Sequence, residues 1–148
     1  MPKTRVFIGS SGAARSQAKL IVRRFENATL EFLPWWDAFV PGTTLLDNLD
    51  AIADRVDAAV LVMSPESEAV IRGSTVQIPN LNVLYEFGFF YGRLGKRRVA
   101  MIKYGDFYLP SDLGGYTHVF GSRIFKRGAT VPVATRTRTD FERWLAGV

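Results

Sequence analysis

The chain has 148 residues, a net charge of +5, 47% hydrophobic residues and 22% charged residues, enough for one folded domain with its own core. It contains no cysteine and a single histidine, His118, which excludes disulfides, cysteine-based zinc sites and multi-histidine metal sites within the sequence. No apolar run approaches the ~20 residues that span a bilayer, and the first residues do not resemble a signal peptide. We therefore expect a single cytoplasmic domain over residues 1–148, with no metal and no membrane partner.

The basic residues that produce the positive charge gather in two places. Lys96, Arg97 and Arg98 form one run, and the others lie mainly in the tail between Arg123 and Arg143. No zinc-finger, RRM or helix-turn-helix pattern accompanies them. This distribution favours a solvated basic surface over nucleic-acid binding, and it is compatible with an anionic small ligand.

The first predicted unit is a strand, a small-residue loop and a helix. Thr4 to Gly9 is a short apolar run, and Ala13 to Phe25 has helical periodicity, with Ser10 and Ser11 in the loop between them. A loop of this kind directs backbone N–H groups at a phosphate or a ribose. Taken alone, the pattern favours an ordinary tight turn between a strand and a helix.

The second predicted unit joins a strand to an aromatic loop. Thr29 to Pro34 is predicted as the strand, and the loop WWDAFVPG follows from Trp35 to Gly42. Two tryptophans and a phenylalanine are costly to leave in water. Two interpretations are open: the rings pack on the edge of the domain, or they form a wall for a flat ligand. Thr44 then caps a predicted helix with an apolar face of Leu45, Leu46, Leu49, Ile52 and Val56.

The remaining strands are predicted from apolar runs. Residues 57–64 and 97–104 are continuous runs typical of parallel strands that are buried on both faces. Glu66 to Ile78 is predicted as a polar connection in which a short helical turn can form. A loop over 106–115, a short strand over 118–120 and a helix over 139–145 complete the chain.

Pro79 to Val99 holds an amphipathic helix, capped by Asn80, and then the start of a strand. The apolar face of the helix is formed by Val83, Phe87, Phe90, Tyr91 and Leu94, and three glycines gather on one flank, where we expect a neighbouring element to come close: Gly88, Gly92 and Gly95. Glu86 lies on the other flank, at the edge of the apolar stripe. A carboxylate in that place is a candidate half-buried reactive group, although most glutamates are surface residues.

The alternation of buried strands with amphipathic helices predicts an α/β fold, with a parallel sheet and helices on both of its faces. In such folds ligands bind beyond the carboxyl ends of the strands, where the strand order reverses. The loops that begin near residues 9, 35, 65 and 104 all leave such ends. The residues therefore predict one pocket there, without indicating a reaction.

Four motifs, taken in order, resemble the bacterial TIR-like family. They are FIGSS at 7–11, WWDAF…PG at 35–42, PNLNVLYEFGFFYGRLG at 79–95 and PSDLGG at 110–115. The resemblance is closest to the TIR halves of antiphage effectors. In those proteins a TIR domain is joined to a cyclic-nucleotide sensor, such as a STING, SAVED or cyclic-nucleotide-binding domain.

The resemblance implies a flavodoxin-like TIR fold, with a central parallel sheet of about five strands. It also implies NAD+ hydrolysis at the nicotinamide–ribose bond, with NAD+ as the substrate and no cofactor. Sensor ligand drives assembly into a homo-oligomer, and NAD+ depletion then halts the infected cell. The chain is expected to be either a piece of a longer effector or a short protein that acts with a separate sensor.

The resemblance also assigns roles to single residues. The catalytic carboxylate maps onto Glu86, and the substrate-binding positions map onto Ser10, Ser11, Trp36 and Phe39. Asn82, one turn before Glu86, is a further candidate for substrate binding. Asn82 orients the carboxylate or touches a ribose hydroxyl, or else it only bonds backbone at the helix start. The family usually has Arg and Asp where this sequence has Asn80 and Leu81. For Arg72 we favour an exposed loop charge, and Arg93 is a possible structural partner of Glu86.

A single carboxylate is sufficient for this reaction. Ordinary glycosidases need two carboxyl groups because an alkoxide leaving group must be protonated. Nicotinamide leaves NAD+ as a neutral molecule, so no general acid is required. One anion then stabilises the positive charge that develops on the ribose. Whether water or an atom of the substrate attacks, and hence whether the product is ADP-ribose or a cyclised form, stays open.

Two alternative functions remain open. The first is a non-enzymatic TIR module that works only by self-association and releases no nicotinamide. The second is another N-glycosidic enzyme, such as a nucleoside deoxyribosyltransferase, which has a related α/β architecture and its own catalytic glutamate. It would exchange bases on deoxynucleosides and ignore NAD+.

Overall fold

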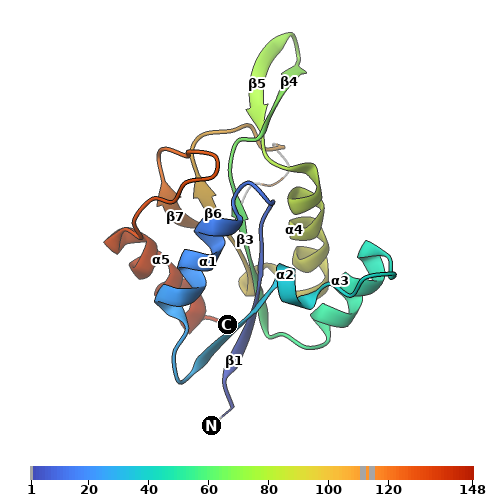
Figure 1. Ribbon diagram of the computed structural model, residues 1–148, viewed down its shortest axis with the longest axis vertical. Helices are drawn as coiled ribbons and strands as arrows, with labels where there is room; N and C mark the ends of the chain where they lie inside the picture. Colours follow the sequence, from blue (N-terminus) through green and yellow to red (C-terminus); the bar gives the residue numbers. More distant parts are fainter. Residues whose placement is uncertain (1, 111–112, 114–115) are drawn as a thin grey trace.

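The computed structural model describes residues 2–110, 113 and 116–148, and its centre is a five-stranded parallel sheet in the order β2-β1-β3-β6-β7 (Figure 1). The strands are β1 (Thr4–Gly9), β2 (Leu30–Pro34), β3 (Ala58–Met63), β6 (Val99–Tyr104) and β7 (Thr117–Ser122). All four neighbouring pairs are parallel. This order confirms the predicted flavodoxin-like α/β fold.

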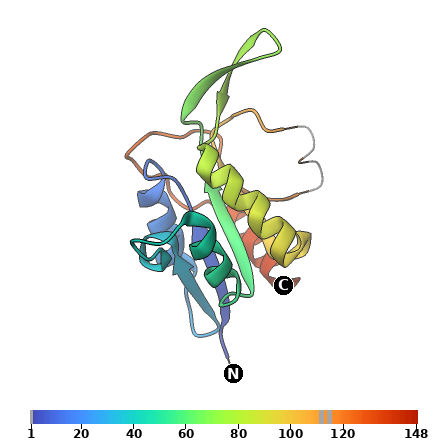
Figure 2. The ribbon, with the colours of Figure 1, turned by 90° about the vertical axis from the view of Figure 1, so that its right-hand side faces the viewer.

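Helices cover both faces of the sheet (Figures 1 and 2). The helices are α1 (Arg15–Phe25), α2 (Trp35–Ala38), α3 (Leu45–Ala53), α4 (Leu81–Leu94) and α5 (Thr135–Ala146), with a 3-10 turn at Lys96–Arg98. Successive side chains of a strand point to opposite faces. Val6 and Ile8 of β1 therefore join a core with α1 and α5, whereas Phe7 joins a second core with α3 and α4.

The segment from Glu66 to Ile78 is a β-hairpin, so the predicted polar connection with a helical turn was wrong. Its strands are β4 (Ser67–Ile71) and β5 (Ser74–Ile78), which pair with each other in antiparallel fashion. Arg72 and Gly73 form the two-residue turn, with φ of 51° and 81°. Two positive φ angles suit the right-handed twist of a tight hairpin. The hairpin projects from the body of the molecule (Figures 1 and 2).

Three further predictions need correction. The aromatic loop begins with the single helical turn α2, and α5 starts at Thr135, four residues before the predicted helix start at Thr139. The glycine flank of α4 is open, because a β-carbon at Gly88 or Gly92 would meet nothing within 4 Å. Gly95 has a different role, since its φ of +90° ends the helix in a conformation that favours glycine.

The other predicted elements are confirmed. Asn80 caps α4, and Thr44 caps α3 by accepting a hydrogen bond from the backbone N–H of Asp47. The PSDLGG motif lies largely outside the described residues. Within the described part of the chain, no helix is both long enough and apolar enough to cross a membrane.

Candidate functional site

The strand order places the predicted pocket at the carboxyl ends of β1 and β3. These two strands are neighbours, with Gly9 opposite Leu61. The chain leaves β1 through α1 toward β2, and it leaves β3 through the hairpin and α4 toward β6. The connections therefore diverge to the two sides of the sheet, which makes this point the reversal of strand order where ligands bind in such folds.

Glu86 projects from α4 toward the end of β1. A β-carbon placed on Gly9 would lie 3.1 Å from Oε2 of Glu86. The glutamate is only 5% exposed, so it is more deeply buried than the half-buried group expected from its position at the edge of the apolar stripe. Among the described residues, Oε2 has no hydrogen-bond partner. A buried, unpartnered carboxylate oxygen is costly, and such groups concentrate at functional sites.

Burial also changes the acidity of this group. Desolvation raises the pKa of Glu86 from 4.5 to about 7, because the charged form loses its contact with water. Arg93, considered above as a structural partner of Glu86, instead pairs with Asp50 of α3 and with Asp54, which caps the end of α3. No cation therefore offsets the desolvation of Glu86 among the residues that the structure describes.

The two serines after β1 are buried beside this point, and their side chains have partners within the protein. The Ser10 hydroxyl accepts a hydrogen bond from Trp35 Nε1 at 2.8 Å and donates one to the Ser11 carbonyl at 2.9 Å. The Ser11 hydroxyl accepts from the backbone N–H of Ala14 at 3.2 Å. These bonds organise the start of α1, whose first turn carries no acidic residue. An amino end of this kind suits an anion.

The aromatic residues divide between the two faces of the sheet. Phe39 belongs to the core on the α4 side, where its ring centroid is 6.3 Å from that of Phe7. Trp36 packs against the core on the α1 side, and the cations of Arg15 and Lys19 lie 5.6 and 5.7 Å from its ring centroid. Both rings therefore pack on the domain, as the first interpretation of the aromatic loop predicts. The second interpretation, a wall for a flat ligand, stays a prediction. Trp35, which the sequence reasoning did not single out, is the ring that bonds to Ser10.

At the start of α4, the two asparagines have different environments. The Asn80 side chain accepts hydrogen bonds from the backbone N–H groups of Asn82 and Val83. Asn82 is exposed one turn before Glu86, on the neighbouring position of the same helix flank. Asn80 therefore accounts for the cap, and the Asn82 side chain is left available for a ligand. Arg72 is an exposed charge in the hairpin turn, as favoured from the sequence.

Ser64 is a site candidate that the sequence reasoning missed. It follows the last residue of β3, is 1% exposed, and its hydroxyl has no hydrogen-bond partner among the described residues. The signal was a polar residue at the end of a continuous apolar strand, in the place where ligands bind. Ser64 and Glu86 are thus two buried polar side chains with unpartnered oxygens near the reversal of strand order.

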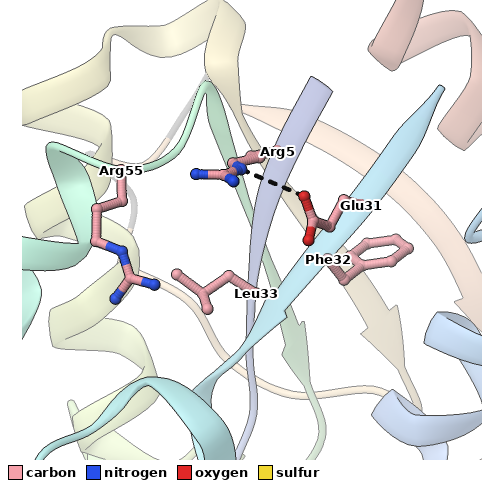
Figure 3. Close-up of a pocket in the computed structure, with 5 residues that line it drawn as sticks. All are labelled: Arg5, Glu31, Phe32, Leu33 and Arg55. Atoms are coloured by element: carbon pink, nitrogen blue, oxygen red, sulfur yellow. Dashed lines mark hydrogen bonds and ion pairs between the residues drawn. The ribbon is translucent and has the colours of Figure 1, made fainter. Parts of the chain in front are cut away.

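A separate small pocket lies near the amino ends of β1 and β2, at the opposite edge of the sheet (Figure 3). It is lined by Arg5, Glu31, Phe32, Leu33 and Arg55, and an ion pair of 3.3 Å joins Arg5 to Glu31. Its volume of about 70 Å³ is far below the ~300 Å³ of a typical small-molecule site. The candidate site at the carboxyl edge rests instead on the strand order and on the position of Glu86. The described residues contain no cluster of three or more His, Asp or Glu suited to a metal.

Comparison with known proteins agrees with the motif resemblance. Residues 5–120 match the family described as CAP12/Pycsar effector protein, TIR domain. The chain is 34% identical over 115 residues to CD-NTase-associated protein 12 of Sphingobacterium faecium, covering 78% of this chain and 35% of that protein. It is 31% identical over 142 residues to the Pycsar effector protein BcPycTIR of Burkholderia cepacia, covering 92% and 47%. With PaPycTIR of Pseudomonas aeruginosa the identity is 30% over 148 residues, covering 95% and 48%.

These comparisons confirm the resemblance to bacterial TIR-like proteins. The matched range includes all six residues assigned from the motifs, and it ends before α5. The chain spans only between about a third and a half of the length of these relatives.

Proposed function

Since the chain belongs to the family of CAP12/Pycsar effector TIR domains, we propose that it cleaves the nicotinamide–ribose bond of NAD+ as the effector domain of a bacterial antiphage system. The observation that carries this proposal is the Glu86 carboxylate, which is buried against Gly9 at the reversal of strand order and has no partner for Oε2. Burial of this kind supports a reactive role over a structural one, because an ion pair or hydrogen bond would satisfy a structural carboxylate.

The proposed chemistry uses Glu86 as an anion. As the bond to nicotinamide breaks, positive charge moves from the pyridinium ring to the ribose, and the nearby carboxylate stabilises it in a site with little water. With its pKa at about 7, Glu86 is only partly ionised at neutral pH. The positive charge of the bound nicotinamide ring favours the carboxylate form, so substrate binding itself increases the ionised fraction.

The remaining assigned residues surround this reaction. We place the diphosphate near Ser11 and the amino end of α1, where backbone N–H groups suit an anion. Ser10 and Trp35 hold that loop through their mutual hydrogen bond. Asn82 is the exposed polar side chain nearest in sequence to Glu86 on its flank, and we assign it to a ribose hydroxyl. Phe39, and Trp36 once Arg15 and Lys19 move aside, supply rings for stacking.

The buried state of Glu86 supports control of this activity by assembly. Because the carboxylate is 5% exposed, the substrate reaches it only after its surroundings rearrange. We propose that a cyclic-nucleotide sensor, either joined to the domain or separate from it, drives self-association and that association opens the site. The active form is then a homo-oligomer.

The proposal is tested by incubating the protein with NAD+ over a wide range of protein concentrations and measuring released nicotinamide. We expect release that rises more steeply than protein concentration and that is abolished in Glu86→Gln and Glu86→Ala. Glu142→Gln, on the exposed surface of α5, is the matched control and keeps full activity. Product identification separates ADP-ribose from a cyclised form.

Three outcomes would contradict the proposal. Nicotinamide release that survives Glu86→Gln would remove the carboxylate from the reaction. Absence of release at every concentration, and in artificially linked oligomers, would favour the non-enzymatic self-association module. Base exchange on deoxynucleosides without any effect on NAD+ would favour the deoxyribosyltransferase-like alternative.

A further inference from the structure

The hairpin of β4 and β5 stands apart from the rest of the fold. Neither strand pairs with the five-stranded sheet, and the ribbon projects from the body (Figures 1 and 2). Four of its apolar side chains share one face, are partly exposed and belong to neither core: Ala69, Ile71, Val76 and Ile78. A two-stranded ribbon is marginally stable in water, whereas three or more strands with an apolar face are stable.

The two edges of this ribbon differ. On the β5 edge, the carbonyl of Gln77 accepts a hydrogen bond from the backbone N–H of Tyr108 at 2.7 Å. Gln77 therefore points its backbone groups away from β4, and so does its antiparallel partner Glu68 on the other side. By the alternation of the ladder, Val70 does the same. Among the residues described, no backbone group pairs with this outer edge of β4.

The outer edge of β4 also has few of the features that natural proteins use to block a free edge. Such edges are usually protected by charged side chains, especially lysine, by proline or by a bulge. The sequence SEAVI contains one charge, Glu68, and no lysine or proline, and its register with β5 runs without a break from Ser67 opposite Ile78 to Ile71 opposite Ser74. Val70 leaves a large apolar side chain 72% exposed.

We infer that the outer edge of β4 pairs with β4 of a second copy of this chain, antiparallel and with a two-fold axis at Ala69. In this register Glu68 of one copy lies opposite Val70 of the other, so the two Glu68 carboxylates do not face each other. Ser67 lies opposite Ile71, and the two Ala69 residues meet at the axis. The strand is thus complementary to itself in backbone groups, as a two-fold interface requires.

The pairing explains how the hairpin becomes stable. Two ribbons joined through β4 form a four-stranded sheet, in which the apolar faces of both copies are continuous. Because the same edge serves both copies, the assembly closes as a dimer and leaves the Gln77 side of each ribbon in contact with Tyr108. The inference adds a surface to the self-association in the proposed function, but it depends only on the hairpin and not on NAD+ as substrate.

Cross-linking through single cysteines tests the register, and the chain contains no native cysteine. The two Ala69 residues would form a non-hydrogen-bonded pair with Cα atoms about 4.5 Å apart, within reach of a disulfide. Val76, opposite Ala69 on β5, is the matched control, because its two copies would be three strand spacings or ~14 Å apart. We expect Ala69→Cys to form a disulfide dimer under mild oxidant at least tenfold faster than Val76→Cys. Equal rates would overturn the inference.

Proline substitutions test the edge itself. Val70→Pro removes an outward N–H and leaves the bonds between β4 and β5 intact, and Thr75→Pro makes the same change at the paired position on the other edge. In sedimentation equilibrium we expect the wild type and Thr75→Pro to form dimers and Val70→Pro to stay monomeric. A monomeric wild type, or a Val70→Pro protein that still associates, would overturn the inference. If Val70→Pro fails to fold, the cysteine pair decides. A variant that loses the dimer but still cleaves NAD+, or one that keeps the dimer but no longer cleaves NAD+, would separate this inference from the proposed function.

Discussion

The carboxylate of Glu86 lies so close to Gly9 that a β-carbon at position 9 would come within 3.1 Å of its Oε2 atom. The same β-carbon would meet Leu61 Cδ1 at 2.5 Å and Phe7 Cε2 at 2.9 Å. The glycine at the end of β1 is therefore the feature that allows a helix carboxylate to reach the sheet edge. Burial in this place raises the pKa of the Glu86 carboxyl group.

Gly9→Ala is expected to lower stability and activity together. The added methyl group overlaps Leu61 and Phe7 and crowds Glu86, and overpacking of this kind costs about 1–3 kcal/mol. Urea unfolding measures the loss, and nicotinamide release measures the displacement of Glu86. Gly12→Ala is the control, because its β-carbon would meet nothing within 4 Å. If the two variants have the same free energy of unfolding, position 9 tolerates a β-carbon and the close contacts at Gly9 do not restrict it.

The dependence of kcat/KM for NAD+ on pH should report the ionisation of Glu86. The carboxylate form is the reactive one and its pKa is about 7, so activity rises with pH and levels off above neutrality. At pH 6 we expect about a tenth of the plateau value. The pH profile of kcat should lie at lower pH, because the bound pyridinium charge favours the carboxylate. A flat kcat/KM between pH 5.5 and 8 would speak against this role.

Glu86→Gln should make the protein more stable at neutral pH. The pKa of Glu86 is raised from 4.5 to about 7 in the folded state, so the protonated group contributes to the stability of the folded state. This contribution is complete below pH 4.5. That contribution is lost as the pH rises from 4.5 through 7, by up to about 3 kcal/mol. The neutral glutamine has no such loss, so the stability difference between variant and wild type grows over this range. Urea unfolding at pH 5 and pH 7.5 measures it, and a difference independent of pH would contradict the burial of the charge.

Substitutions at Asn80 and Asn82 should have different effects, the first on the stability of the fold and the second on substrate binding. Asn80→Ala removes the acceptor for two backbone N–H groups at the start of α4 and should cost about 1 kcal/mol. Asn82→Ala removes an exposed side chain and should change stability by less than about 0.5 kcal/mol. If Asn82 binds a ribose hydroxyl, its variant raises KM for NAD+ severalfold. An unchanged KM would leave Asn82 as a surface residue.

Local periodicity predicted the elements well, and the errors occurred where pairing is not local. The apolar face of α4 and its Asn80 cap follow from spacing within one helix, and the structure confirms both. The hairpin of β4 and β5 was missed, although the alternation in TVQI and the Arg72-Gly73 turn were present. The segment was predicted from its polar residues as a connection, and the ribbon that it forms packs in neither core.

The candidate site shows the same limit. The position of Glu86 on its helix predicted a half-buried group, whereas the group is buried. Ser64 was not predicted, because the sequence at a strand end does not indicate whether a serine hydroxyl has a hydrogen-bond partner. The role of Trp35 depended on the fold bringing it to Ser10, 2.8 Å away. Each of these facts depends on atoms that are distant in sequence.

By itself, the sequence determined the five strands of the sheet, its longer helices and the helix that bears Glu86, and it predicted the carboxyl edge as the place for a ligand, because hydrophobic periodicity acts over neighbouring residues. Tertiary structure alone decided three other properties. It placed Glu86 against Gly9, it raised the pKa of Glu86 by burying the carboxyl group away from water, and it left the outer edge of β4 open. The physical reason is that desolvation and strand pairing depend on which elements meet in space. Those meetings are decided jointly by residues that lie far apart in the chain.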